Sequence, residues 1–162
     1  MGKTLAENAK KMKIRKATTL DVKALQGLIN SYAKEGRMLP RSLSELFENV
    51  RDFSVAEKEG EIIGCCALHS VWEDLAEAKS LAVAKSWRGK GIGQRLLNAS
   101  LKEADSLSIK RVFVLTYEPD FFKKQGFQLI DKSELPHKVW SECIKCVHFP
   151  DCNEVPLIWE VK

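Results

Sequence analysis

The spacing of apolar residues predicts that the chain begins with a short strand and a helix. Residues 13–17 alternate polar and apolar side chains, as a short strand does. Thr18 stands three residues before Asp21, which is the spacing of a helix capping box. The helix that follows has an apolar face made of Leu25, Leu28, Ile29 and Tyr32.

A second, shorter helix is predicted after an exposed loop. Gly36 ends the first helix, and Pro40 sets the turn that follows it. The loop is Arg37-Met38-Leu39-Pro40-Arg41, and Ser42 after it is suited to cap a helix. The apolar residues of that helix are Leu43, Leu46, Phe47 and Val50.

Strands dominate the middle of the chain. Residues 53–58 and 62–71 form a predicted hairpin whose turn is Glu59-Gly60, where glycine supplies the required backbone conformation. Residues 72–74 connect to a further strand, which we expect over 77–83.

The C-terminal half returns to helical spacing over 92–107, followed by a continuous apolar run at 112–115 that is typical of a buried strand. A short helix after Pro119 ends at Gly126, and strands are predicted at 127–130 and 155–161. Hairpins followed by strand, helix and strand indicate an α/β (α+β) fold with a mixed, mostly antiparallel sheet flanked by helices.

Composition narrows the choice of partners. The 162 residues suit one domain over 12–162, preceded by a flexible tail at 1–11 without an apolar signal region. A net charge of +4 without a clustered basic stripe argues against nucleic acid, and the longest apolar run, 62–68, is too short to cross a membrane. Five cysteines, an odd number, favour reduced thiols and a cytoplasmic protein. The oligomeric state is not determined, and a homodimer stays open.

The strongest chemical signal is a glycine-rich turn between a predicted strand and a predicted helix. It reads Arg88-Gly89-Lys90-Gly91-Ile92-Gly93-Gln94. Glycines let the backbone approach an anion, and the N–H groups at the start of a helix point at it. The turn therefore indicates a phosphate site, to which Arg88 and Lys90 add charge.

Competing interpretations of this turn fit less well. A P-loop needs Ser or Thr after Gly-Lys, but Gly91 follows Lys90. A dinucleotide fingerprint starting at Gly91 needs a small residue where Leu96 stands. A tight turn without a ligand would explain one glycine but not three beside two cations.

The turn, together with the preceding Leu81-Ala82-Val83, resembles the acyl-CoA pyrophosphate loop of GNAT acetyltransferases. The resemblance implies acetyl-CoA as co-substrate and a splayed strand pair in the sheet. It also implies that the backbone of residues 81–83 holds the pantetheine arm, with an oxyanion donor near Ala82 or Val83. Residues 121–127, which include Phe122 and end in Gly126-Phe127, resemble the family's second hallmark, and we place Phe122 at the cofactor.

Further short motifs resemble stand-alone amino-acid N-acetyltransferases of the N-acetylglutamate synthase type. They lie at 38–42, 64–69, 112–116 and 135–140. This resemblance implies transfer of acetyl to the α-amine of glutamate or glutamine, the first step of arginine biosynthesis. The alternatives are another small amine, a protein N-terminus, or a catalytically silent acyl-CoA-binding module.

Catalysis needs a base, because an α-amine is mostly protonated at pH 7. Glu77 is the candidate, and the alternative is an exposed strand-end carboxylate. The family's thiolate-protonating tyrosine is replaced here by Phe122, and Thr116 and Tyr117 are the nearest substitutes. Their alternative roles are a strand-end hydrogen bond and a packed aromatic.

An anionic acceptor needs a cation, and Arg41 can meet a carboxylate with two parallel hydrogen bonds. Lys79 and Arg37 are weaker candidates, and for each the alternative is a solvated surface charge.

One compact set of metal-ligand residue types remains: Cys143, Cys146, His148 and Cys152. The single residue between Cys146 and His148 leaves little slack for a tetrahedral site, so thiols without metal are favoured over zinc. His69 and His137 are expected to be structural, and Trp72 and Trp140 to be packing residues.

Overall fold

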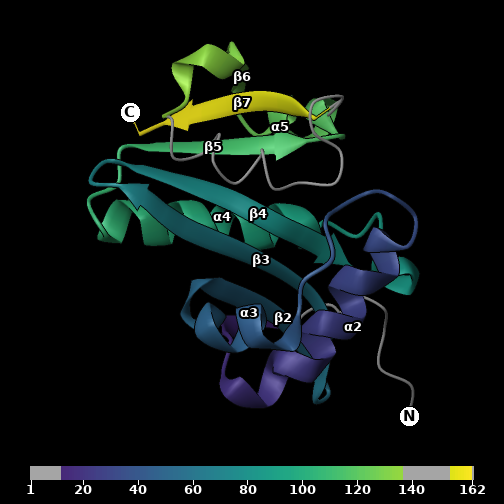
Figure 1. Cartoon of the computed structure of the whole chain (residues 1–162). Coiled ribbons are helices and arrows are strands. Elements are labelled where there is room, and N and C mark those ends of the chain that lie inside the picture. The colour runs from purple at the N-terminus through teal and green to yellow at the C-terminus, as the bar shows by residue number, and fades with distance from the viewer. Residues whose placement is uncertain (1–11, 137–153, 162) are drawn as a thin grey trace. The chain divides into compact units, whose positions relative to one another are not determined.

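The computed structural model describes residues 12–136 and 154–161, which form two compact units (Figure 1). Of the described residues, the first unit contains 12–68 and Ser80–Lys102, and the second contains His69–Lys79, 103–136 and 154–161. Two strands, β3 (Glu61–Trp72) and β4 (Leu75–Val83), run through both units. The strands follow the order β1-β2-β3-β4-β5-β7-β6 in a mixed sheet of seven strands, which confirms the predicted fold class.

The first unit holds the N-terminal elements and the glycine-rich turn. Its strands are β1 (Lys13–Lys16) and β2 (Phe53–Lys58), with the first part of β3 and the end of β4. Its helices are α2 (Val22–Ala33), α3 (Leu43–Glu48) and most of α4 (Ile92–Ser106), with 3-10 turns η1 (Thr19–Asp21), η2 (Val50–Asp52) and η3 (Lys85–Trp87). Strands β1, β2 and β3 pair antiparallel. The predicted capping box at Thr18 and the Ser42 cap are both present.

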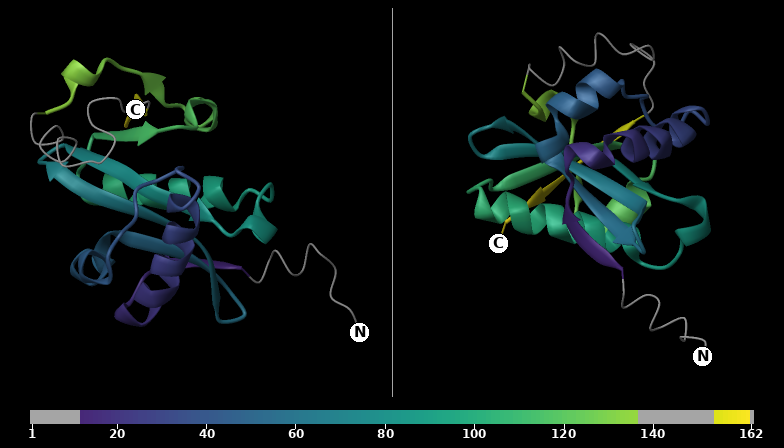
Figure 2. Two further views of the ribbon diagram at one scale, coloured as in Figure 1. Left: turned by 45° about the vertical axis from the view of Figure 1, so that its right-hand side comes forward. Right: turned by 90° about the horizontal axis from the view of Figure 1, so that it is seen from below.

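Helices α2 and α4 lie on opposite faces of the strands in this unit (Figure 2), and an apolar cluster packs on each face. Helices α2 and α3 pack on one face through Leu25, Ile29, Tyr32 and Leu46, which meet Val55, Cys65 and Ala82. Helix α4 packs on the other face through Ile92 and Leu96, which meet Ala56, Ile63 and Cys66. Alternate residues of β3 and β4 therefore serve different helices, as the period-2 geometry of a strand requires.

Two irregularities shape the strands that lead to the turn. Ala56 pairs with Gly64 but Glu57 pairs with Ile62, so Ile63 is the extra residue of a β-bulge in β3. In β4, Ser80 has φ 55°, a conformation that side chains other than glycine seldom adopt. Ser80 lies in β4, the strand that leads to the glycine-rich turn, and the Ile63 carbonyl oxygen in the bulge accepts from the N–H of Ala84, just after that strand.

The second unit contains β5 (Arg111–Thr116), α5 (Pro119–Lys124), β6 (Gln128–Leu129), the 3-10 turn η4 (Lys132–Glu134) and β7 (Val155–Glu160). Its core is built on Leu75, Phe113 and Leu135. β5 pairs antiparallel with β7 from Arg111 to Thr116, whereas its parallel ladder with β4 covers only residues 75–77 and 111–113. The short parallel ladder agrees with the predicted splayed pair.

Some expectations were wrong in detail. Only Leu46 of α3 is buried, while Leu43 and Phe47 are exposed and Val50 falls in the following 3-10 turn. Trp72, expected to pack, is 68% exposed at the end of β3. The strand expected from Glu77 begins two residues earlier, so Glu77 is an internal strand residue.

None of the described helices has the length and apolar character that a membrane span requires.

Candidate active site

The glycine-rich turn leads directly into helix α4. Gly89 and Gly91 have φ 75° and φ 80°, which places both in the left-handed region that favours glycine. The backbone N–H of Arg95 donates to the Gly91 carbonyl oxygen at 3.1 Å, and this bond closes the first turn of the helix. The N–H groups of Ile92, Gly93 and Gln94 precede this donor, and a helix cannot satisfy such groups itself.

The space around Gly89 and Gly91, where a side chain would stand, is empty. A Cβ atom added at Gly89 or at Gly91 would meet no heavy atom within 4 Å. Packing therefore does not require these glycines, but their backbone conformation does. The N–H groups of the first turn lie at the positive end of the helix dipole, where an anion binds favourably.

Two cations of the turn rest on aromatic rings of the first unit. The Arg88 guanidinium carbon lies 5.9 Å from the centroid of the Tyr32 ring, and the Lys90 ammonium lies 4.7 Å from that of Trp87. Arg88 and Lys90 are both exposed. Cation–π contacts of exposed groups are weak, so these side chains remain available to an anionic ligand.

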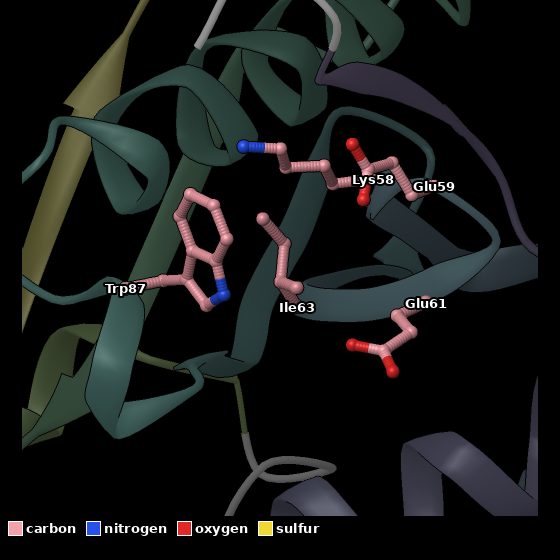
Figure 3. Close-up of a pocket in the computed structure, with 5 residues that line it drawn as sticks. All are labelled: Lys58, Glu59, Glu61, Ile63 and Trp87. Atoms are coloured by element: carbon pink, nitrogen blue, oxygen red, sulfur yellow. The ribbon is translucent and has the colours of Figure 1, made fainter. Parts of the chain in front are cut away.

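A pocket of about 280 Å³ lies beside Trp87 (Figure 3). It is lined by Lys58, Glu59, Glu61, Ile63 and Trp87, and the Lys58 ammonium lies 4.3 Å from the centroid of the Trp87 ring. The sequence did not predict this pocket, because its lining comes from the β2–β3 hairpin and from η3, which no motif connects.

The end of β4, where the pantetheine arm was predicted, is held by three contacts to its backbone. The Tyr32 hydroxyl donates to the Val83 carbonyl oxygen at 2.5 Å, and the Cys65 thiol donates to that of Ser80 at 3.3 Å. The Ala84 N–H donates to the Ile63 carbonyl oxygen at 2.8 Å. Burial raises the pKa of the Cys65 thiol, so this thiol stays protonated and remains a donor.

Tyr32 and Cys65 were not predicted as site residues. Tyr32 stood on the apolar face of its helix, and Cys65 inside an apolar strand. Neither position carries a local signal of its long-range hydrogen bond.

The predicted catalytic residues belong to the second unit. Glu77 is half-buried and pairs with Phe113 at the last position of the parallel ladder, so it is not an exposed strand-end carboxylate. The Thr116 hydroxyl oxygen accepts from the Glu118 N–H at 2.9 Å. Tyr117 is 36% exposed.

Phe122 and Lys79 also belong to the second unit. The Phe122 ring is buried and makes edge-on contacts with Phe121 and Phe127, at 5.0 and 5.4 Å between ring centroids. Lys79 is half-buried on β4. Phe122 is thus a packing residue of the second unit, and its contact with the cofactor stays a prediction.

The predicted acceptor residue Arg41 is held in the first unit rather than loose in solvent. Its backbone N–H donates to Asn30 Oδ1 at 3.2 Å, and its guanidinium lies 3.9 Å from the Glu45 carboxylate. Its side chain is 26% exposed, compared with 48% for Arg37, which lies 3.9 Å from Glu35. Arg41 is therefore more ordered by its contacts than a solvated surface cation.

The residues of the suggested metal cluster, Cys143 to Cys152, lie outside the described part of the chain, as do His137 and Trp140. Within the described ranges, no three His, Cys, Asp or Glu side chains are grouped as metal ligands would be.

Comparison with known proteins supports the resemblance of the glycine-rich turn to that of GNAT acetyltransferases. Residues 49–129 match the model of the acetyltransferase (GNAT) domain. An uncharacterized N-acetyltransferase of Chlorobaculum tepidum is 38% identical over 90% of this chain and 94% of its own length. An amino-acid acetyltransferase of Mycobacterium tuberculosis is 39% identical over 80% of this chain and 75% of its own length.

A solved structure extends the comparison to the fold. N-acetylglutamate synthase from Neisseria gonorrhoeae, complexed with coenzyme A and N-acetyl-glutamate, superposes with a TM-score of 0.86 at 28% identity. The match covers 93% of this chain but only 35% of that one.

Fold and turn are thus those of an enzyme that handles an acyl-CoA. The chain belongs to the GNAT acetyltransferase family, as its motif at residues 81–93 predicted. It is an N-acetyltransferase that uses acetyl-CoA as its acetyl donor.

Proposed function

We propose that this enzyme transfers the acetyl group of acetyl-CoA to the α-amine of L-glutamate or L-glutamine, the first step of arginine biosynthesis. The observation that carries the proposal is the open glycine turn at the start of α4, combined with an ordered arginine in the loop at 37–41. The name of the Mycobacterium relative and the N-acetyl-glutamate in the Neisseria complex support the choice of acceptor.

The turn seats the pyrophosphate of acetyl-CoA. The N–H groups of residues 92–94 face the phosphate oxygens, and Gly89 and Gly91 admit them without a Cβ in the way. Arg88 and Lys90 exchange their contacts with aromatic rings for charge-assisted hydrogen bonds to phosphate, which are stronger. The pantetheine arm of acetyl-CoA binds to the backbone of Leu81, Ala82 and Val83, before the turn.

Glu77 removes the proton from the acceptor amine, directly or through a water. Glu77 is half-buried within β4, and a carboxylate within hydrogen-bond reach of the amine can take up its proton. The amine nitrogen then attacks the thioester carbon, the carbon–sulfur bond breaks, and the thiolate of coenzyme A leaves. Thr116 or Tyr117 supplies the proton that the thiolate takes up, since Phe122 cannot.

Arg41 binds the acceptor carboxylate. The contact between its guanidinium and Glu45, at 3.9 Å, is too long for a good hydrogen bond, so an acceptor carboxylate can replace it with two shorter bonds.

The test is a thiol-release assay with acetyl-CoA and a panel of free amino acids, small amines and peptide N-termini. We expect release with glutamate or glutamine at least tenfold above the other amines. Release with a different amine alone would overturn the choice of acceptor. Binding of acetyl-CoA without release for any amine would show a silent binding module.

A further inference from the structure

The last turn of helix α2 and the residues just after it contact two segments: residues 83–88, which are proposed to bind the cofactor, and the loop at 37–41, which is proposed to bind the acceptor. The side chain of Tyr32 hydrogen-bonds to Val83, and that of Asn30 hydrogen-bonds to Arg41. Glu35, just beyond the helix, forms an ion pair with Lys85. All of these contacts lie within the first unit.

Tyr32 reaches the cofactor strand. Its ring is buried in the core between α2 and the strands, with 6% of the residue exposed, and its hydroxyl donates to the Val83 carbonyl oxygen at 2.5 Å. A buried ring has little freedom to move, so its hydroxyl fixes the position of Val83, the last residue of β4, relative to the core. This is the backbone that the family resemblance assigns to the pantetheine arm.

The Tyr32 ring also makes a cation–π contact with Arg88. The guanidinium carbon lies 5.9 Å from the ring centroid, and the neighbouring Glu35 is ion-paired with Lys85 in η3. The hydrogen bond from Lys85 lowers the pKa of the Glu35 carboxyl, and the charges of Arg37 and Arg88 add to this effect. One helix end therefore touches residues 83, 85 and 88 of the strand and turn that bind the cofactor.

The helix end also holds the loop at 37–41. Asn30 Oδ1 accepts from the Arg41 N–H at 3.2 Å, and the Arg37 N–H donates to the Tyr32 carbonyl oxygen at 3.2 Å. Asn30 and Tyr32 are two residues apart, so the position of this one helix turn sets both the hydrogen bond to Val83 and the support of the Arg41 backbone.

We propose that Tyr32 is a positioning residue of the acetyl transfer, which aligns Val83 and Arg88 for the cofactor and couples them to the Arg41 loop. The part that concerns the loop rests on the proposed role of Arg41, whereas the part that concerns the cofactor does not.

The first test is Tyr32→Phe, which keeps the ring under Arg88 and removes only the hydroxyl. Coenzyme A affinity is measured by calorimetry without acceptor, and we expect it to fall about three- to tenfold, the range for the loss of one hydrogen bond. Tyr32→Leu removes the ring as well, and its affinity is expected to fall further. A thermal melt of each variant verifies that it is folded.

Ser31→Ala is the matched control. Ser31 lies on the same turn, is exposed, and donates its hydroxyl to the Leu28 carbonyl oxygen at 2.7 Å, a bond that stays within the helix. Its loss is expected to leave coenzyme A affinity unchanged. Equal affinities of Tyr32→Phe, Ser31→Ala and the parent protein would overturn the positioning role.

The second test addresses the coupling. Asn30→Ala frees the backbone of Arg41, and KM for the acceptor and coenzyme A affinity are then compared in Asn30→Ala, Tyr32→Phe and the double variant. We expect the two substitutions to be non-additive by at least twofold, as for residues of one connected unit. Additive effects would overturn the coupling. Failure of glutamate as a substrate would leave the calorimetric result standing, so the two proposals fail separately.

Discussion

At the scale of single residues, Arg41 is the position where a structural and a functional role can be separated by experiment. Among the described residues its guanidinium has one ion pair, with Glu45 at 3.9 Å, and a pair that is this long and partly open to solvent contributes little to stability. Its removal should therefore be visible in kinetics rather than in folding.

For Arg41→Ala we expect kcat/KM for glutamate to fall roughly ten- to a hundredfold, the equivalent of about 1.5 to 3 kcal/mol for a charge-assisted hydrogen bond. KM for acetyl-CoA should stay nearly constant. Arg41→Lys should recover only part of the loss, because lysine keeps the charge without the planar two-point fork. Initial rates measured by varying each substrate separately give kcat and the KM for each substrate.

Arg37→Ala is the comparison variant, since Arg37 is a cation of the same loop with a similar contact to a glutamate at 3.9 Å. If it lowers glutamate affinity while Arg41→Ala does not, the acceptor role belongs to Arg37. A fall in acetyl-CoA affinity in Arg41→Ala would instead indicate a cofactor role.

Asp21 and Arg15 together join β1, η1 and β2 of the first unit. Asp21 accepts from both terminal nitrogens of Arg15 at 2.8 and 2.9 Å, and from the Thr18 N–H at 2.7 Å. Arg15 also donates to Glu57 at 2.5 Å. The hydrogen bonds from Arg15 are the main cause of the lowered pKa of Asp21.

A carboxyl whose pKa is lower in the folded than in the unfolded chain stabilises the fold above its unfolded pKa of about 4. This stabilisation is lost as the pH falls through the folded pKa. We expect Asp21→Asn to lower the free energy of unfolding at pH 7 by about 1.5 to 3 kcal/mol, and the difference to shrink below pH 4. Urea titrations from pH 7 to pH 3 measure it.

The exposed Asp105 on α4 provides a control, because Asp105→Asn should change stability little at any of these pH values. An equal loss for Asp21→Asn at pH 7 and at pH 3 would contradict an electrostatic origin.

At the scale of elements, helix α4 approaches strand β3 so closely that a side chain at Gly64 would force its neighbours to shift. A Cβ atom at Gly64 would lie 2.9 Å from Leu96 Cδ1 and 3.3 Å from both the Ala82 carbonyl oxygen and Ile92 Cγ2. Ile92 is the first residue of α4, so this contact helps to position the N-terminal end of the helix, which is the end proposed to bind the pyrophosphate.

Gly64→Ala is expected to destabilise the fold by about 1 to 3 kcal/mol, because the backbone oxygen of Ala82 cannot yield as a side chain can. Gly27→Ala on α2 is the matched control, since its Cβ would meet nothing within 4 Å. Alanine there should stabilise by about 0.5 to 1 kcal/mol through helix propensity. Urea midpoints that move in opposite directions would support the packing argument, and a neutral Gly64→Ala would refute it.

The sequence predicted most helices and strands and the glycine-rich turn, but it did not predict side-chain contacts between residues that are far apart in the chain. The glycines beside cations at 88–94, the hairpin turn at Glu59-Gly60 and the cap at Ser42 are local sequence patterns, and the local structure agrees with each of them. The hydrogen bond from Tyr32 to Val83 joins residues 51 apart, and no pattern encodes such a pair. Phe47 and Trp72 were misjudged because hydrophobic character alone does not say whether a neighbouring element covers a side chain.

At the scale of the whole molecule, acetyl-CoA should stabilise the native chain by mass action. A ligand that binds only the folded state contributes RT ln(1 + [L]/Kd), about 2.7 kcal/mol at a hundredfold excess over Kd. For a protein of this size, this corresponds to a rise in Tm of roughly 5 to 10 °C.

Gly91→Val should abolish this rise, because a β-branched residue is strained at φ 80° and its side chain would fill the space the pyrophosphate needs. The variant should also lose intrinsic stability, so the change in Tm on adding acetyl-CoA is the quantity to compare, not Tm itself. Gly60→Val separates the two effects, since Gly60 has φ 81° and open space around its Cβ position but lies in the β2–β3 turn. It should be destabilised to a similar degree and keep the full rise with acetyl-CoA. A Gly91→Val protein that still gains 5 °C or more would show that the pyrophosphate binds elsewhere.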